Sequence, residues 1–466
     1  MAPNTAIVLD RTLYDLYRLD NEDGVLPALV YNPFKVEKPK TSPTAKFIYH
    51  TGFFDPRTAE EDETVDMLNK LRMRAMPQRN GFGAGNMQII VLRLELPGLD
   101  LAQETAQQLE AEVHRNFSQL PRDQQPKVTY LTKLDDIASI PDVLLGVSRP
   151  SDALMHLPHL ADPEMHYEVL SKRGLAKSGL PTPPSTIIDT LLGPDDVHDV
   201  AKVSSEVARM ISPLDTYQIP FVVKLPQTSG TGTFVVLCEA HRLKVKQMLQ
   251  PWMEGMLPRI NQINRQLHPC SLVLQKFITG KLVALSMFVT RKGRAIFICC
   301  CKQRFNKQGH WTGASISYAD QDGMHKTYRG CIEKAALFLH QKGYYGPTGI
   351  DIIMDGSGEQ YIIDLNVRLT GSYNLGLLAG HFTKRGLNSA TLEKANFSCT
   401  RAEFEETFRR EMSEGRIIIT AWTHEESTST SYGVVIIGGV DRMEVKRLVE
   451  RVQVHTIYAG AYAGGC

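Results

Sequence analysis

The 466 residues include 52 Lys plus Arg and 51 Asp plus Glu, which gives a formal net charge of +1 when the histidines are neutral. Proteins that neutralise many nucleic-acid phosphates usually carry a basic excess or a basic block. Neither is present, so we expect no nucleic-acid partner. The content of 42% hydrophobic and 22% charged residues is typical of a globular protein with about two to four domains.

The N-terminus and the cysteines predict the compartment. Asp and Arg side chains interrupt the first twenty residues, which leaves no apolar core for a signal peptide. No apolar run approaches the ~18 residues that span a bilayer. The eight cysteines form no CxxC pair, and Cys299 and Cys301 would share one face of a strand while Cys300 lies on the other. We therefore expect free thiols in a reducing cytoplasm, without structural zinc or membrane contact.

Two regions precede the densest motifs. Residues 1–130 contain a strand pattern from Met87 and then an amphipathic helix pattern, which together predict an N-terminal α/β domain. Residues 131–215 hold short strands and a helical stretch from Met165 that ends at Gly179, just before a proline.

Two further regions follow. Residues 216–385 are rich in strand patterns separated by glycine turns, which predicts an antiparallel sheet with helices, an α+β arrangement. Residues 386–466 alternate helix and strand patterns and predict a small C-terminal α/β appendage.

A hairpin pattern near residue 360 carries the strongest chemical signal. Two strand patterns flank the turn at 355–358, and pairing about that turn places Asp351 opposite Asp364. Opposed carboxylates weaken a sheet unless a divalent cation lies between them. Alternation puts Asn366 and Arg368 on the face of Asp364, and oxygen ligands of this kind suit Mg²⁺, with Mn²⁺ as an alternative. A solvated polar hairpin is the competing interpretation.

A second signal begins at Lys224, inside an apolar strand pattern. A lysine there must find an anion or reach solvent. The following loop, 227–233, contains two glycines and four hydroxyl side chains that can donate to phosphate oxygens. Because no GxxxxGK[ST] motif is present, the pattern predicts a hairpin lid and not a P-loop. An ordinary exposed hairpin is the alternative. The glycines at 80–86 precede a strand, so they predict a loop and not a dinucleotide site.

In order and spacing, these motifs resemble the ATP-grasp superfamily of carboxylate-amine ligases, over about residues 165–382. The fold class expected is α/β and α+β: an ATP-grasp fold with a pre-grasp-like N-terminal domain and the C-terminal appendage. Residues that the resemblance assigns to nucleotide binding are Lys172, Lys224, Ser229, Gly230, Thr231, Gly232, Gln275, Lys276, Phe277 and Ile278. It assigns the metal to Asp351, Asp364 and Asn366.

Three positions depart from the family pattern. Gln275 stands where Glu is frequent, Leu282 replaces an acid that commonly holds the ribose, and Asp364 stands where Glu is commoner. The shorter side chain of Asp364 reduces the reach of that carboxylate by one methylene.

The resemblance implies that ATP phosphorylates a small carboxylic or amino acid to an acyl phosphate, and that an amine then attacks to give an amide, ADP and phosphate. Arg368 and Lys224 would be the catalytic residues. Further candidates for substrate contact, with a surface role as the alternative, are Lys302, Arg304, Ser372 and His381. Two other functions stay open, a small-molecule kinase and a catalytically degenerate nucleotide-binding regulator. The protein could also form a homodimer.

Overall fold

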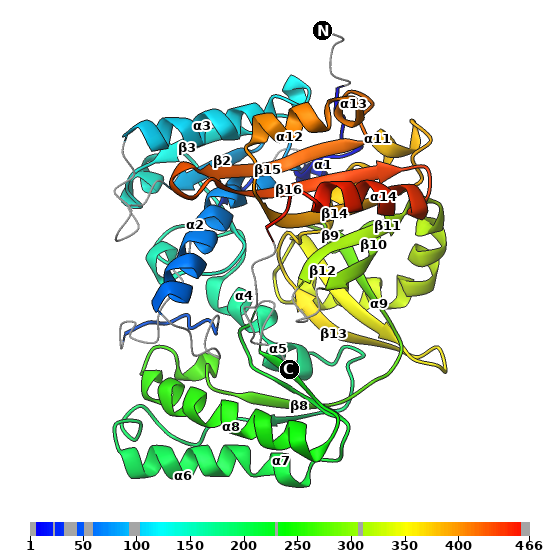
Figure 1. Cartoon of the computed structure of the whole chain (residues 1–466). Helices are drawn as coiled ribbons and strands as arrows, with labels where there is room; N and C mark the ends of the chain where they lie inside the picture. Colours follow the sequence, from blue (N-terminus) through cyan, green and yellow to red (C-terminus); the bar gives the residue numbers. More distant parts are fainter. Residues whose placement is uncertain are drawn as a thin grey trace.

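The computed structural model of the chain describes residues 6–21, 24–31, 44–50, 59–92, 103–228, 232–305 and 311–457. Three sheets organise these residues, and helices cover their faces (Figure 1). Among the described residues, no helix is both long enough and apolar enough to cross a membrane.

The N-terminal part contains a four-stranded parallel sheet. Its strand order is β3-β2-β1-β4, with the bounds Ala28–Val30 (β1), Gln88–Leu92 (β2), Lys127–Leu131 (β3) and Leu145–Val147 (β4). The helices of this part are Leu13–Arg18 (α1), Ala59–Gly81 (α2) and Gln103–Phe117 (α3). The expected α/β unit is present, and β4 extends it beyond residue 130.

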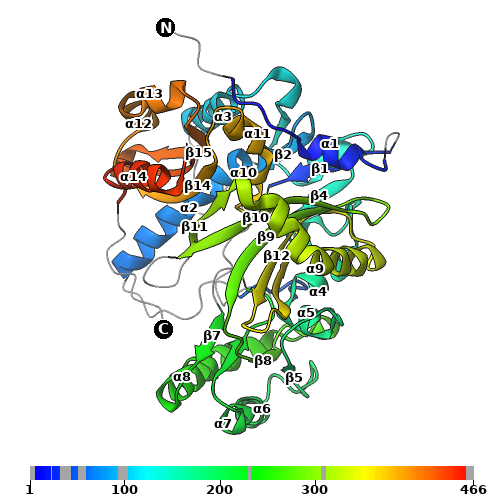
Figure 2. The same ribbon diagram turned by 90° about the vertical axis from the view of Figure 1, so that its right-hand side faces the viewer.

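A smaller lobe lies at one end of the molecule (Figures 1 and 2). Its antiparallel sheet has the order β5-β8-β6-β7, with the bounds Ser185–Ile188 (β5), Phe221–Lys224 (β6), Thr233–Val236 (β7) and Leu272–Lys276 (β8). The helices that cover it are Val200–Ile211 (α6), Pro213–Thr216 (α7) and Glu239–Met256 (α8). On α6, Val203, Val207 and Met210 are buried at helical spacing, which fixes the face that packs into the core of this lobe.

The largest sheet is antiparallel and has eight strands, in the order β13-β12-β9-β10-β11-β14-β16-β15. Its first five strands are Lys281–Val289 (β9), Ala295–Phe305 (β10), Trp311–Ser317 (β11), Gly346–Met354 (β12) and Gln360–Asn366 (β13). The last three are Ser389–Phe397 (β14), Ile417–Glu425 (β15) and Thr430–Gly439 (β16). Helices associated with this sheet and its edges are Pro163–Leu170 (α4), Lys172–Lys177 (α5), Gln321–Gln341 (α9), Tyr373–Leu377 (α10), Ala379–Thr383 (α11), Arg401–Thr407 (α12), Arg409–Ser413 (α13) and Arg442–Gln453 (α14).

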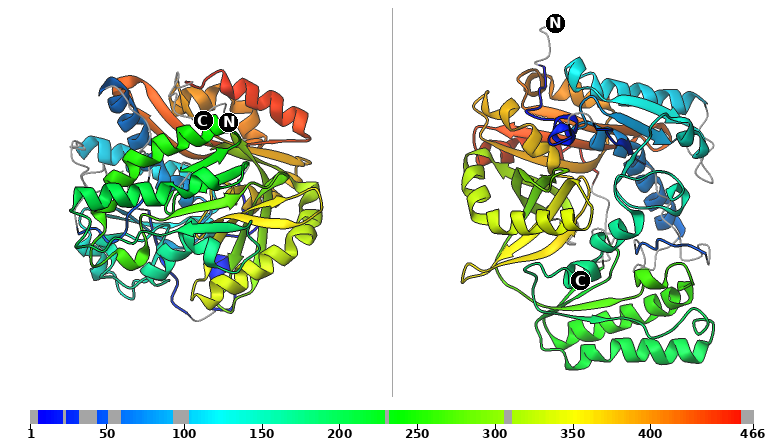
Figure 3. Two further views of the ribbon diagram at one scale, coloured as in Figure 1. Left: turned by 90° about the horizontal axis from the view of Figure 1, so that it is seen from below. Right: turned by 180° about the vertical axis from the view of Figure 1, so that it is seen from behind.

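The C-terminal α/β segment shares the large sheet, because β14 pairs with β11. One face of β14 and β16 packs on a core that includes Leu71 and Ala75 of α2, and the other face packs on α12 and α14. Viewed from behind, the orange and red C-terminal elements lie at the end opposite to the green lobe (Figure 3). The segment is therefore an extension of the central sheet.

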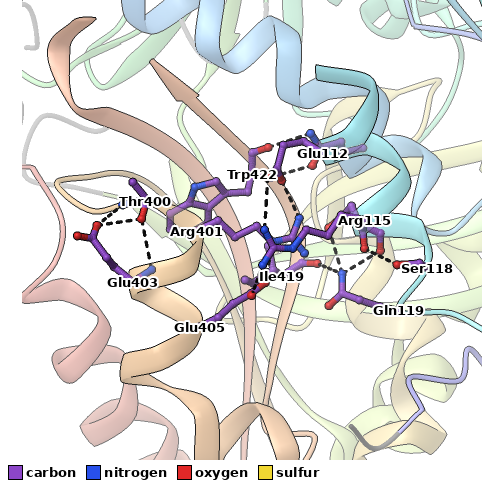
Figure 4. Close-up of polar contacts among 12 residues, drawn as sticks. Glu112, Arg115, Ser118, Gln119, Thr400, Arg401, Glu403, Glu405, Ile419 and Trp422 are labelled. Carbon is purple, nitrogen blue, oxygen red and sulfur yellow. Dashed lines mark hydrogen bonds and ion pairs between the residues drawn. The ribbon is translucent and has the colours of Figure 1, made fainter. Parts of the chain in front are cut away.

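A polar network also joins α3 to α12 (Figure 4). The Arg401 side chain is only 4% exposed, and its guanidinium binds Glu112 at 3.0 Å and Glu405 at 2.8 Å. Arg115 forms an ion pair with the same Glu405. In addition, Gln119 donates to the Ile419 carbonyl of β15 at 2.9 Å. The N-terminal and C-terminal segments are thus bound to each other by charge as well as by packing.

Two local features differ from the sequence patterns. The stretch from Met165 to Gly179 forms two helices, because Ser171 is extended and its hydroxyl caps α5 by accepting from Gly174 N at 2.7 Å. Helix α2 was not expected, since its many charged residues and Pro77 hide the buried face. The expected placement of the cysteines is confirmed: Cys299 and Cys301 lie in one core and Cys300 in another.

Candidate active site

The hairpin of β12 and β13 forms as its turn residues predict. The Asp355 carboxylate accepts from Ser357 N at 2.9 Å and from Glu359 N at 3.0 Å, and Gly358 adopts a left-handed φ of +89°. Farther along the ladder, Asp351 lies opposite Asp364, so the expected pairing of the two carboxylates is confirmed.

The pKa of Asp351 is raised to about 7. Burial is the main cause, and the negative charge of Asp364 adds to it. A hydrogen bond from Gln303 and the charges of Lys172 and Lys224 act in the opposite direction. Without a further cation, the two carboxylates therefore resist being ionised together near neutral pH.

The pKa of Asp364 is lowered. Burial alone would raise the pKa, but the charge and the hydrogen bond of the Lys172 ammonium outweigh this effect. Lys172 is 8% exposed and stands in the first turn of α5, where its backbone N–H donates to the Pro226 carbonyl at 2.8 Å. This contact ties the position of Lys172 to the loop that begins after β6.

Lys224 extends from β6 of the small lobe toward the same hairpin. Its ammonium donates to the Ile363 carbonyl at 2.7 Å, and Lys224 is only 7% exposed. Burial lowers the pKa of Lys224 to about 8, with Lys172 contributing and Asp364 opposing. Two lysines from separate elements thus meet the edge of β13 beside the paired carboxylates.

Asn366 and Arg368 complete this polar group. The Arg368 guanidinium donates to Asn366 Oδ1 at 3.0 Å, and burial together with the charge of Arg149 lowers the pKa of Arg368 to about 10. Arg368 also lines a cavity of about 40 Å³ between the parallel sheet and β12. His166 lines the same cavity and contacts the Val367 carbonyl through Nε2 at 2.8 Å, which fixes the backbone between Asn366 and Arg368.

The donor set fits a hard divalent cation. Asp351 and Asp364 offer carboxylate oxygens on adjacent strands, and Asn366 offers an amide oxygen on the face of Asp364. A cation between the carboxylates would remove the repulsion that raises the pKa of Asp351. Among the described residues, no group of three or more His, Cys, Asp or Glu side chains forms a metal cage. Two carboxylates and an amide leave coordination positions open, which suits Mg²⁺.

The lid is described only in part. Ser229, Gly230 and Thr231 lie outside the described residues. Gly232 adopts a φ of +75°, and a Cβ there would lie 2.3 Å from the Thr228 methyl carbon. The loop therefore needs glycine at this position both for its backbone conformation and because a side chain would not fit.

The expected adenine hinge joins the two antiparallel sheets. Gln275 ends the buried part of β8 and donates to the Ser185 hydroxyl at 3.0 Å. Lys276 is exposed, and Phe277 and Ile278 are half-buried in the connection that leads to β9. The nucleotide role of these four residues stays a prediction.

The four tentative substrate residues are dispersed. Lys302 is exposed on β10. Arg304 forms an ion pair with the buried Glu393, and Ser372 is buried 3.5 Å from the Ser286 hydroxyl. His381 is 3% exposed and contacts the Gly415 carbonyl at 2.9 Å, so its ring joins α11 to the start of β15. The structure does not bring these residues together.

The sequence patterns missed three residues that act on the site. Gln303, which bonds Asp351, lies between Lys302 and Arg304, so strand alternation would have placed it on the opposite face. Arg149 and Arg79 act electrostatically on Arg368 from the N-terminal part. They are distant in sequence, and no local pattern indicates that they approach the hairpin.

Residues 211–372 match the family model of the ATP-grasp domain. The chain contains an ATP-grasp domain. The match includes Lys224, the expected hinge and the whole hairpin of β12 and β13, whereas Lys172 precedes it. The match confirms the expected resemblance to the ATP-grasp superfamily over residues 211–372, and the three sheets with their helices confirm the mixed α/β fold class.

Comparisons with other proteins were distant. A search of curated proteins gave no match. The ADP complex of N5-carboxyaminoimidazole ribonucleotide synthetase superposes with a TM-score of 0.49 at 11% identity, covering 81% of this chain and 93% of that one. Biotin carboxylase from Campylobacter jejuni gives 0.47 at 11% identity, covering 83% and 89%. The synthetase from Thermus thermophilus gives 0.46 at 13% identity, covering 80% and 93%.

Proposed function

We propose that the chain is an ATP-dependent carboxylate-amine ligase that forms an amide bond through an acyl phosphate and releases ADP and phosphate. The observation that carries the proposal is the convergence of Lys172 and Lys224 on the paired carboxylates of the hairpin. Phosphoryl transfer requires positioned charges more than covalent catalysis by the protein. This arrangement supplies both positive and negative charges within one site.

Each residue has a physical role in this proposal. Lys172 and Lys224 would neutralise nucleotide phosphates, for which their ammonium groups must leave Asp364 and the Ile363 carbonyl. Asp351, Asp364 and Asn366 would hold Mg²⁺, which supplies charge neutralisation to the phosphates when bound.

Arg368 would bind the substrate carboxylate. Its fork of N–H donors matches a carboxylate or the transferring phosphoryl group. Its pKa of about 10 keeps it charged at neutral pH. The lid after Lys224 would exclude the water that hydrolyses an acyl phosphate.

The experiment is an ADP-release screen of the full chain with Mg²⁺-ATP against carboxylic and amino acids, each with and without amines, followed by mass analysis. Ligation predicts ADP release that depends on both substrates and a product of amide mass. A stable phosphorylated product without amine would instead indicate a kinase. The absence of ADP release with every pair would contradict catalysis and favour the nucleotide-binding regulator.

A further inference from the structure

Three cations that the proposed function does not use lie within electrostatic reach of one another where α2 meets the large sheet; Arg72 is exposed, and Arg79 and Lys394 are half-buried. Arg72 and Arg79 are seven residues apart, so they lie on one side of α2, about 10 Å apart along its axis. Lys394 is two residues from Leu392, whose side chain packs in the core with α2, so alternation directs Lys394 to the same side. The charges of both arginines act on Lys394.

No acid neutralises this cluster in the part of the chain that the structure describes. Arg79 Nε donates to Asn80 Oδ1 at 3.0 Å, and Arg72 makes a long contact of 3.5 Å with Asn69 Oδ1. The nearby carboxylates are engaged elsewhere, since Arg74 binds Glu425 and Arg304 binds Glu393. Burial and then the two arginines lower the pKa of Lys394 to about 7. Within the described ranges, the Lys394 ammonium thus has no counter-charge.

Two polar groups adjoin the cations. Asn396, two residues after Lys394 on the same face, is 9% exposed, and its Oδ1 is buried without a hydrogen-bond partner among the residues that the structure describes. Tyr432 lies opposite Asn396 on β16, and its hydroxyl experiences the charges of Arg79 and Arg72. An unpaired buried acceptor beside uncompensated cations is costly unless a ligand with both an anionic group and a donor occupies the space.

The cluster adjoins the metal hairpin. The Lys394 ammonium lies 5.0 Å from the centre of the Trp311 ring. The same ring fits against Gly371, where a Cβ would approach a ring carbon to 2.6 Å. Gly371 follows Arg368 by three residues, and the charge of Arg79 reaches Arg368. The Trp311 ring thus connects Lys394 to the segment that follows Arg368, and the charge of Arg79 acts on both Lys394 and Arg368.

We infer that Arg72, Arg79 and Lys394 bind a second anionic group, a carboxylate or a phosphate, on a substrate whose reacting carboxylate lies near Arg368. The identity of this ligand as a substrate rests on the proposed ligase function. Anion binding by the three side chains does not depend on that function. The substrate class is a small molecule with two ionised or ionisable ends, such as a dicarboxylate or a phosphorylated acid.

The first test measures anion binding with the nucleotide site filled by Mg²⁺ and a non-hydrolysable ATP analogue. Inorganic phosphate and glutarate are added at constant ionic strength, and the melting temperature is followed for wild type and Lys394→Met. We expect one of the anions to raise the melting temperature of wild type and the shift to fall by about half or more in the variant. Phosphate alone would indicate a phosphorylated substrate, and glutarate alone a dicarboxylate. Equal shifts in both proteins, or none in wild type, would overturn the inference.

The matched control is Lys384→Met, the same change at an exposed lysine after α11. It should respond to the anions as wild type does. Without anions, Lys394→Met should melt at the same temperature as wild type or higher, because the substitution removes repulsion from Arg72 and Arg79. Arg72→Gln provides a second variant, with Arg447→Gln on α14 as its control, in case the Met side chain disturbs Trp311.

The second test separates this inference from the proposed function. For substrates found in the ADP-release screen, Lys394→Met should raise KM about ten-fold or more and leave the affinity for ATP unchanged. Unchanged KM in a variant that still forms product would overturn the inference alone. A normal anion response in a wild-type protein that forms no product would leave the anion site in place and contradict the ligase function alone.

Discussion

The Lys224 ammonium of the small lobe donates a hydrogen bond of 2.7 Å to the Ile363 carbonyl of the large sheet. Ile363 is the residue at which the β12–β13 register shifts, and it is left without a partner in the ladder. A bulge of this kind releases backbone groups from the sheet. The same irregularity therefore provides the acceptor for Lys224 and sets Asp364 opposite Asp351.

Asp364→Asn should abolish most Mg²⁺-dependent ATP turnover. We expect a loss of about 100-fold or more, because the substitution removes a carboxylate charge from the metal set. The measurement is ADP release with the best substrate pair. Asp355→Asn is the matched control, since Asn keeps the turn acceptor at the tip of the same hairpin. Equal activity of both variants would contradict the metal assignment.

Lys224→Met should separate nucleotide binding from folding. The affinity for ATP should fall about ten-fold or more, because a charge-assisted contact to phosphate is lost. The free energy of unfolding should stay equal or rise, since burial already lowers the pKa of Lys224 to about 8. Calorimetric titration with the nucleotide and denaturant unfolding measure the two effects. Lys281→Met, at the exposed start of β9, should change neither.

Arg401→Met should destabilise the joint between α3 and α12. The substitution leaves Glu112 and Glu405 without their buried cation, at a cost of about 3 kcal/mol in the free energy of unfolding. Urea unfolding gives the value. At Arg409, which is exposed on α13 and pairs with Glu406, the same change should cost below about 0.5 kcal/mol. Similar losses in the free energy of unfolding at both positions would show that Arg401 does not stabilise the contact between α3 and α12.

Two buried histidines should make the fold sensitive to mild acid. Burial lowers the pKa of His50 and of His166 to about 4, against about 6.5 in the unfolded chain. Between these two pKa values, the histidines bind protons in the unfolded state but stay neutral in the folded state. The free energy of unfolding therefore falls as the pH drops from about 6.5 to 4. Each histidine should account for about 3 kcal/mol at the lower end.

Unfolding followed across that pH range tests this expectation. His50→Gln retains a donor for the Pro269 carbonyl but cannot acquire charge, so its stability should depend less on pH than that of wild type. An unchanged slope would mean that other groups govern the acid sensitivity.

The pairing of the two carboxylates in the hairpin could be predicted from sequence because its signals are local. A turn signal, two alternating strands and a polar set in register all fall between Gly346 and Arg368. The β-bulge that brings the two carboxylates opposite each other could not be predicted from the sequence. Near the turn, Met354 lies opposite Gln360, and this register alone would place Asp351 opposite Ile363. The extra residue of the bulge shifts the pairing to Asp364.

The cation cluster could not be predicted because it is assembled from distant segments. Arg72 lies on a helix whose buried face contains few large apolar residues, among them Leu71, with Ala75 one turn later. Lys394 lies on β14, a strand that the patterns did not reveal, with Leu392 as a buried neighbour on its face. Only the packing of α2 on the large sheet brings these charges together.

The pairing of β14 with β11 also determines which fragments of the chain can be produced without aggregation. A protein cut at residue 385 would end beside β11 and leave the hydrogen-bonding groups from Gly313 to Ser317 without their partners on β14. It would also uncover the apolar side chains Ala314 and Ile316 near that edge. An unprotected strand of this kind recruits other chains. Expressing the ATP-grasp domain without the C-terminal strands should thus yield aggregates, although the nucleotide motifs would be intact.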